Sequence, residues 1–255
     1  AGKGGMEHPS NLGVQLAREL QKEFGGRIFM VDPPCVDELC DMARMTGIDG
    51  VPRHTNMHAL NLRGVAMHHA KHVLGKKYED CCFIVCHIDG GISVSAHRYG
   101  RIIDCNDAAG GDGPYTPTRI GSVSVADILE YVRDKDIDEV KKLCTRTGGF
   151  VSHFGTSSSD AVHKMAEEGD KKAIRVWDGM KYQIVKYIGA MAAVLGGGRT
   201  VGNTDILETR SIFVLIRRKR SWRRSARLQK KRISALHRSQ ALAPSMISLQ
   251  AYTTQ

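Results

Sequence analysis

Apolar residues recur along the chain with two periods, and these periods predict an α/β protein. The helical spacing of about 3.6 residues recurs in seven segments: residues 11–23, 36–45, 58–74, 124–133, 136–144, 159–168 and 170–195. Dense apolar runs predict strands at Arg27–Val31, Cys81–His87, Gly91–His97 and Arg101–Cys105. The last three runs are joined by Gly90-Gly91 and Tyr99-Gly100, which suit tight antiparallel turns.

The order of these elements predicts the fold class. Three antiparallel strands followed by helices form the opening half of a ribonuclease-H-like fold, in which a further strand pairs parallel with the first. We therefore expect a mixed sheet flanked by helices, incomplete at both ends of the chain. After Leu195 the chain runs into Gly196-Gly197-Gly198, where the further strand does not follow directly. The short apolar run Ile212–Ile216 is the candidate for that position.

The net charge of +10 is confined to the end of the chain. Residues 201–255 contain 12 Lys and Arg against two acidic residues, whereas residues 1–200 contain 25 of each sign. The body of the chain therefore gives no electrostatic reason to expect a nucleic acid partner. We place one domain boundary in the loop Gly47–Pro52 and a second at residue 197, where a basic tail begins that could be disordered.

Cysteine usage and hydropathy indicate a cytoplasmic protein with no membrane partner. The count of seven cysteines is odd, and several lie in apolar runs such as Cys81–Cys86, which is typical of reduced thiols packed as small hydrophobic residues. No Cys-x-x-Cys pair suggests a metal site. No apolar run approaches the roughly 20 residues that span a bilayer. The segment Ala1–Met6 lacks the apolar core of a secretory signal, and we expect the chain to begin partway through a longer protein.

Two glycine-rich segments are candidate phosphate sites. His87 ends a predicted strand and precedes Gly90 and Gly91, which let backbone N–H groups approach phosphate oxygens. The same glycine pair is also ordinary hairpin chemistry. The loop Asn106–Gly121 is too long and too rich in glycine for a plain turn, and it delivers Arg119, whose planar guanidinium can bind two oxygens at once. A surface loop with a solvated arginine is the alternative interpretation.

Histidines and one carboxylate add weaker signals. His58 opens a predicted helix, where it could donate to a phosphoryl oxygen, and Asp32 ends a predicted strand, where carboxylates often meet Mg²⁺ or water. His54 and His58 stand four residues apart, as do His68 and His72, and this spacing can hold zinc on a helix. No acidic or cysteine partner completes either set, so packed or solvated histidines are the simpler interpretation.

Taken together, these segments resemble the butyrate kinases of the acetate kinase family, within the sugar kinase/actin-like superfamily. The resemblance covers about residues 5–195. Its ordered matches are His8-Pro9-Ser10-Asn11-Leu12-Gly13, Val31-Asp32-Pro33, His58-Ala59-Leu60-Asn61, His87 to Val94, Gly111 to Gly121, Gly148-Gly149-Phe150 and Gly189 to Leu195. So many matches in the same order are not expected by coincidence.

The resemblance implies an actin-like ATPase fold and a phosphotransferase activity. Residues 1–52 would be the end of a first lobe and residues 53–196 a second lobe, with the active site between them and the tail, residues 197–255, outside the match. ATP, with Mg²⁺, would phosphorylate the carboxylate of butyrate or a related short-chain fatty acid. The complete enzyme would be a homo-oligomer.

By position, the resemblance also assigns site residues. His58 and Arg119 would bind and stabilise the transferring phosphoryl group. Phosphate contacts would come from His8, His87, Gly90 and Gly91. Asp32 would help to hold Mg²⁺ or its waters. A carboxylate is already a nucleophile, so the chemistry needs positioning and positive charge rather than a general base.

Three departures from the family pattern leave other functions open. Asp89 stands in the glycine turn, where its carboxylate would repel phosphate unless it faces away or binds a metal. Residues 157–163 lack an expected arginine. After Leu195 the expected apolar strand, and the Gly-Gly nucleotide loop that should follow that strand, do not appear. One alternative is a catalytically inactive fragment of such a kinase. The other is a nucleic-acid-binding protein that uses the basic tail, although the tail contains one Trp and no recognised binding motif.

Overall fold

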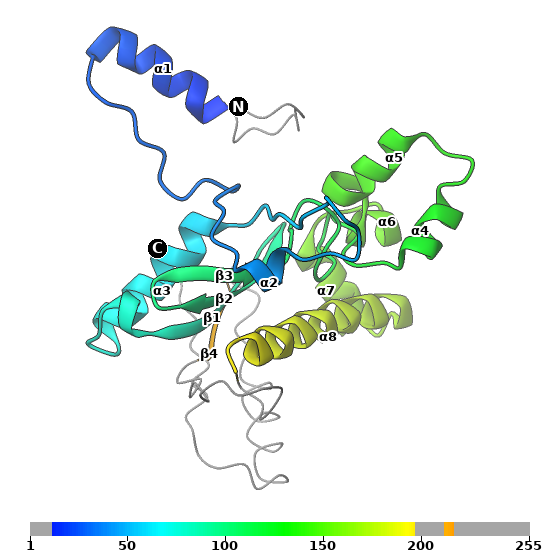
Figure 1. Ribbon diagram of the computed structural model, residues 1–255. Helices are drawn as coiled ribbons and strands as arrows, with labels where there is room; N and C mark the ends of the chain where they lie inside the picture. The colour runs from blue at the N-terminus through cyan, green and yellow to red at the C-terminus, as the bar shows by residue number, and fades with distance from the viewer. Residues whose placement is uncertain (1–11, 197–211, 217–255) are drawn as a thin grey trace, which may run out of the picture.

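The computed structural model describes residues 12–196 and 212–216, and it centres on one four-stranded sheet (Figure 1). The strands are β1 (Cys82–Ile88), β2 (Ile92–Arg98), β3 (Arg101–Cys105) and β4 (Ile212–Ile216), in the order β3-β2-β1-β4. β1, β2 and β3 form an antiparallel meander, whereas β4 runs parallel to β1. The predicted mixed sheet is therefore confirmed.

Two tight turns fix the register of the meander. The β2–β3 turn consists of Tyr99 and Gly100, whose φ angles are +50° and +84°. Positive φ at both positions is what a two-residue hairpin turn needs to match the twist of its strands. The β1–β2 turn is closed by Asp89 N–H, which donates to Gly91 O at 3.0 Å. The three strands predicted after residue 80 each lie within one residue of their observed positions.

Helices frame the sheet. Their bounds are α1 (Leu12–Phe24), α2 (Asp41–Arg44), α3 (Ala59–His72), η2 (Tyr78–Asp80), α4 (Val125–Tyr131), α5 (Ile137–Lys142), η3 (Leu143–Thr147), α6 (Gly149–Phe154), α7 (Ser159–Glu167) and α8 (Lys171–Val194). Four of the predicted helices begin at a side chain that accepts a backbone N–H: Ser124, Asp136, Ser158 and Asp170. The π-helical turn η3 and the short helix α6 were not predicted.

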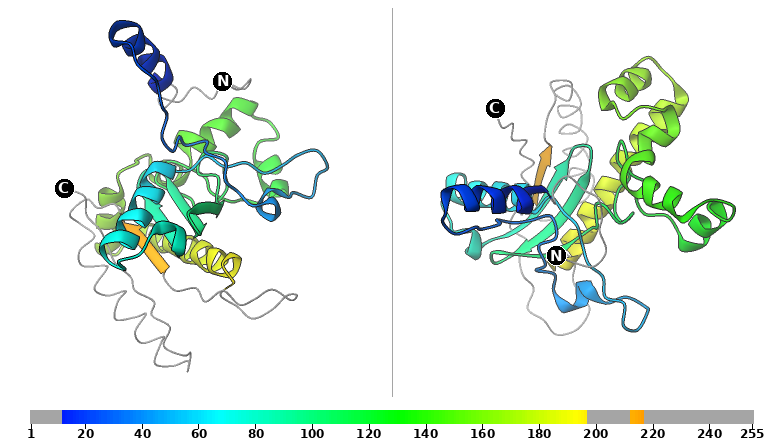
Figure 2. Two further views of the ribbon diagram at one scale, coloured as in Figure 1. Left: turned by 60° about the vertical axis from the view of Figure 1, so that its left-hand side comes forward. Right: turned by 90° about the horizontal axis from the view of Figure 1, so that it is seen from above.

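Both faces of the sheet are covered. Successive residues of β1 point to opposite faces: Ile84 and Cys86 join a core with α7 and α8, whereas Phe83 and Val85 join a core with α3. Figure 2 shows α3 and α8 on opposite sides of the sheet. Burial on both faces explains why β1 is apolar along most of its length instead of alternating with polar residues.

The first described helix, α1, lies apart from the sheet. The helix was predicted, but none of its residues is buried, and Leu16 and Phe24 are 62% and 74% exposed. Figure 1 and the left view of Figure 2 show it separated from the rest of the described chain. The strand predicted at Arg27–Val31 is wrong, because this segment pairs with no described strand and its apolar residues are exposed. A strand without a neighbour is not stable.

The helix predicted over residues 36–45 is confined to α2. The residues before it run extended beside β3, where Cys40 N–H donates to Ile103 O at 2.9 Å and Ile102 N–H donates to Glu38 Oε2. These bonds satisfy backbone groups along the outer edge of β3, which would otherwise stand open. The domain boundaries at residues 52 and 196 stay predictions.

β4 fills the position that the fold class requires next to β1. Ile84 of β1 lies opposite Ile212, and the two strands are parallel. The apolar run suggested for this place is therefore confirmed, although it comes later in the chain than the fold class led us to expect. Apart from β4, the predictions for the tail lie outside the described residues. Among the described residues, no helix has the length and apolarity that crossing a membrane requires.

Candidate active site

His58 stands at the N-terminus of α3. It is the N-cap residue of that helix, and its backbone N–H donates to Ser93 Oγ at 3.3 Å. Its ring nitrogen Nδ1 lies 2.8 Å from the same hydroxyl. Met57, which is almost fully buried, anchors the chain just before the helix. The imidazole of His58 is therefore held on two sides, by the helix start and by β2.

His87 lies beside His58. It is the penultimate residue of β1, and its Nδ1 atom is 2.9 Å from Oδ1 of Asn61 in the first turn of α3. The two imidazole rings are stacked, with centroids 3.9 Å apart and an angle of 18° between their planes. The spacing of His58 and Asn61, three residues on one helix, places both on the face that meets the end of β1.

Gly91 forms the floor of the site. A Cβ atom at this position would lie 2.6 Å from Nη1 of Arg119 and 2.9 Å from Cε1 of His58. Any side chain would displace one or both groups, so the turn needs glycine here because of close approach and not because of its backbone angles. The neighbouring Gly90 O accepts a hydrogen bond from Thr116 Oγ1 at 2.8 Å. The β1–β2 turn thus contacts the loop that carries Arg119.

Arg119 is a half-buried cation with an unused donor. Its Nη1 donates to Ala108 O at 2.5 Å, and its backbone N–H donates to Thr116 Oγ1 at 3.1 Å. Its Nε atom is buried and has no hydrogen-bond acceptor within the described residues. Burial lowers the pKa of the Arg119 guanidinium, and the Asp107 carboxylate acts in the opposite direction. A buried guanidinium with an unpaired donor is suited to receive an anion.

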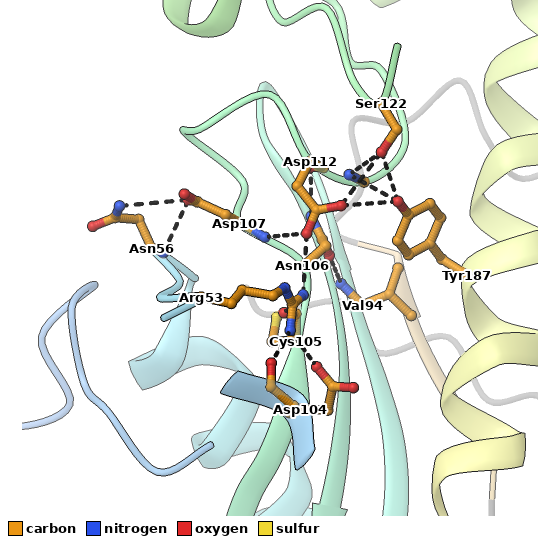
Figure 3. A network of polar contacts seen from close by, with 12 residues as sticks. Arg53, Asn56, Val94, Asp104, Cys105, Asn106, Asp107, Asp112, Ser122 and Tyr187 are labelled. Atoms are coloured by element: carbon orange, nitrogen blue, oxygen red, sulfur yellow. Dashed lines mark hydrogen bonds and ion pairs between the residues drawn. The ribbon is translucent and has the colours of Figure 1, made fainter. Parts of the chain in front are cut away.

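The loop that carries Arg119 is tied to β2 by Asn106. This fully buried side chain accepts from Val94 N–H at 2.7 Å and donates to Ile92 O at 3.1 Å (Figure 3). Its amide therefore takes the place of one more residue of β3 in the sheet. Gly113 lies against it, and a Cβ at Gly113 would overlap the Asn106 amide. The loop leaves the sheet on a fixed path.

Arg53 and Asp112 anchor the middle of the same loop. Arg53 forms ion pairs with Asp104 at 2.8 Å and Asp112 at 3.1 Å, and Asp112 Oδ1 accepts from Tyr187 of α8 at 3.0 Å (Figure 3). Burial acts to raise the pKa of the Asp112 carboxyl, but the Asp107 N–H and the Arg53 guanidinium outweigh it and lower that pKa. This network was not predicted from the sequence.

The structure brings most of the predicted site residues together and places one of the described ones, Asp32, elsewhere. His58, His87, Gly91 and Arg119 are in mutual reach, with Gly90 beside them. His8 lies outside the described residues. Asp89 is exposed at the tip of the turn.

Asp32 does not contact this group. Its carboxylate pairs with Arg63 Nε at 2.8 Å, and Arg63 Nη1 donates to Gly100 O in the opposite hairpin. Asp32 has a positive φ of +42°, a strained conformation of the kind that often marks functional sites. In the described ranges, no group of three or more His, Cys, Asp and Glu residues is arranged to hold a metal ion. His68 and His72, whose spacing could suit zinc, are in ring contact with each other.

Comparison with known proteins now places this geometry in a family. The sequence model of the acetokinase family matches residues 51–203. The chain belongs to the acetokinase family. A probable butyrate kinase of Listeria monocytogenes is 42% identical over 193 residues, which are 75% of this chain and 54% of the relative. Butyrate kinase 1 of Clostridium acetobutylicum is 40% identical over the same shares. The chain spans about half the length of these acetokinase relatives.

Solved structures agree at the level of the fold. The propionate kinase of Francisella tularensis aligns with a TM-score of 0.66 and 15% identity, over 85% of this chain and 58% of that one. The acetate kinase of Porphyromonas gingivalis aligns with a TM-score of 0.64 and 18% identity, over the same shares. The predicted family and the actin-like ATPase fold are thus confirmed.

Proposed function

We propose that this acetokinase-family chain transfers the γ-phosphoryl group of ATP to the carboxylate of butyrate or a related short-chain fatty acid. The observation that carries the proposal is the cradle in which Gly91 admits both the Arg119 guanidinium and the His58 ring to van der Waals contact. The printed names of the relatives, probable butyrate kinase and butyrate kinase 1, support the choice of acceptor.

Each residue of the cradle has a role in this reaction. The transferring phosphoryl group spreads negative charge over three oxygens, and catalysis consists mainly of positioning and charge stabilisation. Arg119, with its unpaired Nε donor, and His58 stabilise that charge. His87 contacts the same group from beside His58, and Gly90 and Gly91 hold the turn beneath it. The acceptor carboxylate needs no general base.

ATP and Mg²⁺ are the cofactors of this proposal. The buried, unpaired Arg119 donor fits an anionic ligand such as the ATP phosphates. The metal fits less well, because the described residues hold no cluster of metal ligands and Asp32 is paired with Arg63. Mg²⁺ often binds through one carboxylate together with substrate phosphates and water. Asp32 is the carboxylate that would take this place.

Localisation and assembly follow the same proposal. All seven cysteines are free thiols, and Cys81, Cys86 and Cys105 are buried, which supports a reducing cytoplasm. We also propose that the complete enzyme is a homo-oligomer.

An acyl-phosphate assay tests the function. Acyl phosphate formed from butyrate and Mg-ATP is trapped with hydroxylamine, and calorimetry measures Mg-ATP binding. We expect hydroxamate that requires butyrate, ATP and Mg²⁺ together, and a loss on the order of 100-fold or more for Arg119→Ala. Arg101→Ala is the matched control, because Arg101 is exposed at the start of β3. Hydroxamate no higher than in a butyrate-free control would contradict the proposal and support the inactive fragment.

A further inference from the structure

The Thr116 hydroxyl joins the β1–β2 turn to the backbone of Arg119. Thr116 is only 2% exposed, and its Oγ1–H donates to Gly90 O at 2.8 Å. The same oxygen accepts from the backbone N–H groups of Thr118 at 3.2 Å and Arg119 at 3.1 Å. A carbonyl can only accept and a backbone N–H can only donate, so the direction of each bond is fixed. The hydroxyl therefore spends its one proton on the turn and both of its lone pairs on the loop.

Residues 116–119 form a short turn that depends on this hydroxyl. The Thr116 N–H donates to Arg119 O at 3.1 Å, which links the first and last residues of the segment. Threonine hydroxyls that accept from backbone N–H groups two and three residues further on stabilise such turns. The ring of Pro117 fixes the φ angle of the next residue. The backbone of Arg119 is thus held in a defined place relative to Thr116.

The start of α6 supports the same turn through backbone contacts. Thr118 O accepts from Gly148 N–H at 3.0 Å. Gly149 has a φ of +58°, and a Cβ atom there would overlap Thr116 O. A backbone contact this close needs glycine. The turn therefore has two supports, α6 through the backbone and the β1–β2 turn through the Thr116 hydroxyl.

We propose that Thr116 is a positioning residue that sets the Arg119 guanidinium against Gly91. The inference rests on the proposed function, because it takes the ligand at this place to be a phosphoryl anion. The hydroxyl bonds Gly90, and the guanidinium lies against the next residue of the same turn. A shift of residues 116–119 relative to Gly90 would therefore move the guanidinium relative to the floor of the site. A displacement of about 1 Å can reduce turnover on the order of 100-fold.

Three variants test this role, each checked for folding by urea unfolding. Thr116→Val keeps the shape of the side chain and removes the hydroxyl, whereas Thr116→Ser keeps the hydroxyl. Thr118→Val is the matched control: the Thr118 hydroxyl makes a longer bond, of 3.3 Å, to the same Gly90 O, which keeps Thr116 as a donor when Thr118 is changed. Titration with inorganic phosphate, without metal, should show a loss of about tenfold for Thr116→Val and changes within about threefold for the other two.

Either of two results of this titration would overturn the inference. One is an affinity of Thr116→Val equal to that of Thr118→Val. The other is a loss in Thr116→Ser as large as the loss in Thr116→Val, because the hydroxyl would then not be the group that matters.

The same substitution in a chain that already carries Arg119→Ala separates positioning from a general structural role. If Thr116 acts through the guanidinium, Thr116→Val should change phosphate affinity by less than about twofold once the guanidinium is gone. NMR titration at high phosphate concentration measures this weaker binding. Equal losses in the two backgrounds would overturn the inference, because the hydroxyl would then act on the fold and not on Arg119.

Amide hydrogen exchange of the unmodified chain tests the bonds without any substitution. We expect the N–H groups of Thr118 and Arg119 to exchange slowly, because the Thr116 hydroxyl binds both. Exchange of both at the rate of an unprotected amide would overturn the inference, even if Thr116→Val does not fold.

Failure of the proposed function gives a different result. The expected phosphate affinities in a chain that forms no butyrate-dependent hydroxamate would support the role of Thr116 and contradict the proposed reaction. An unmodified chain that binds no phosphate would remove the phosphoryl site itself, and with it both the inference and the proposed function.

Discussion

Alanine substitutions at the two glycines of the β1–β2 turn test whether Gly91 is required for close contact with Arg119 and His58 or only for the geometry of the turn. In Gly91→Ala the new methyl group would lie 2.6 Å from Arg119 Nη1 and 2.9 Å from His58 Cε1. In Gly90→Ala the new methyl group would meet nothing within 4 Å. Neither glycine has a positive φ that would strain an alanine. The two variants therefore differ in one respect, whether the cradle of the candidate site is filled.

The size of the overlap sets the size of the effect. Non-bonded heavy atoms pack at about 3.5 Å, so the Arg119 guanidinium must retreat by about 1 Å. Because the obstacle is the far end of a flexible side chain, Gly91→Ala should fold, with a stability loss of about 1 kcal/mol. A displacement of about 1 Å at a positioning group can reduce turnover on the order of 100-fold.

Three measurements on both variants check this prediction: urea unfolding, phosphate titration and butyrate-dependent hydroxamate formation. Gly91→Ala should lose about 100-fold in turnover and about tenfold in phosphate affinity. Gly90→Ala should stay within about threefold of the unmodified chain, a difference below 1 kcal/mol. Equal effects of the two alanines, or unchanged phosphate affinity in Gly91→Ala, would refute the assignment of Gly91 as the floor of the site.

Further predictions concern the charges around the site and the core. Arg119→Lys keeps the charge but loses the planar fork, and phosphate affinity measured by calorimetry should fall about tenfold. Arg53→Met leaves Asp104 and Asp112 without their cation, so urea unfolding should show a loss of stability of about 2 kcal/mol. Arg44→Met, which removes the cation of an exposed pair, is the control and should change stability far less. Burial lowers the pKa of His97 from 6.5 to about 3. Between these pH values the unfolded chain binds a proton that the folded chain does not. The free energy of unfolding should therefore decrease as the pH is lowered from 6.5 toward 3, by up to about 1.4 kcal/mol per pH unit. His97→Gln should flatten that slope, and an unchanged slope would refute the burial argument.

The strands and long helices were predictable because their signals are local. β1 is apolar over nearly its whole length, and Tyr99-Gly100 has the turn chemistry that its positive φ angles demand. In the segments that were predicted wrongly, the local pattern of residues did not match the neighbours that the fold provides. Arg27–Val31 reads as a strand, but no described strand pairs with it. Residues 36–40 read as helix, but bonding to the edge of β3 holds them extended.

The supporting residues of the site were not predictable, because their partners are distant in sequence. Asn106 looks like a loop residue until its amide is seen to complete the edge of β2. Arg53 is one basic residue in a loop, and its partners Asp104 and Asp112 lie more than 50 residues away. One signal was available: Ser93 and Ser95 alternate with Ile92, Val94 and Ala96 in β2, and both hydroxyl residues are buried. A buried hydroxyl needs a partner, and each has a histidine as that partner.

The site also shows why residue type and order alone do not define its chemistry. The resemblance to a kinase family assigned His58 to the transferring phosphoryl group and His87 to a phosphate contact, but it said nothing of how each ring is held. Their environments differ: the Ser93 hydroxyl lies beside Nδ1 of His58, and the Asn61 amide oxygen, which can only accept, lies beside Nδ1 of His87. These two neighbours hold the two imidazole rings in place. The neighbours lie 35 and 26 residues from the histidines they orient. The fold that joins β1, β2 and the start of α3 is therefore what brings the two histidines together in the candidate site.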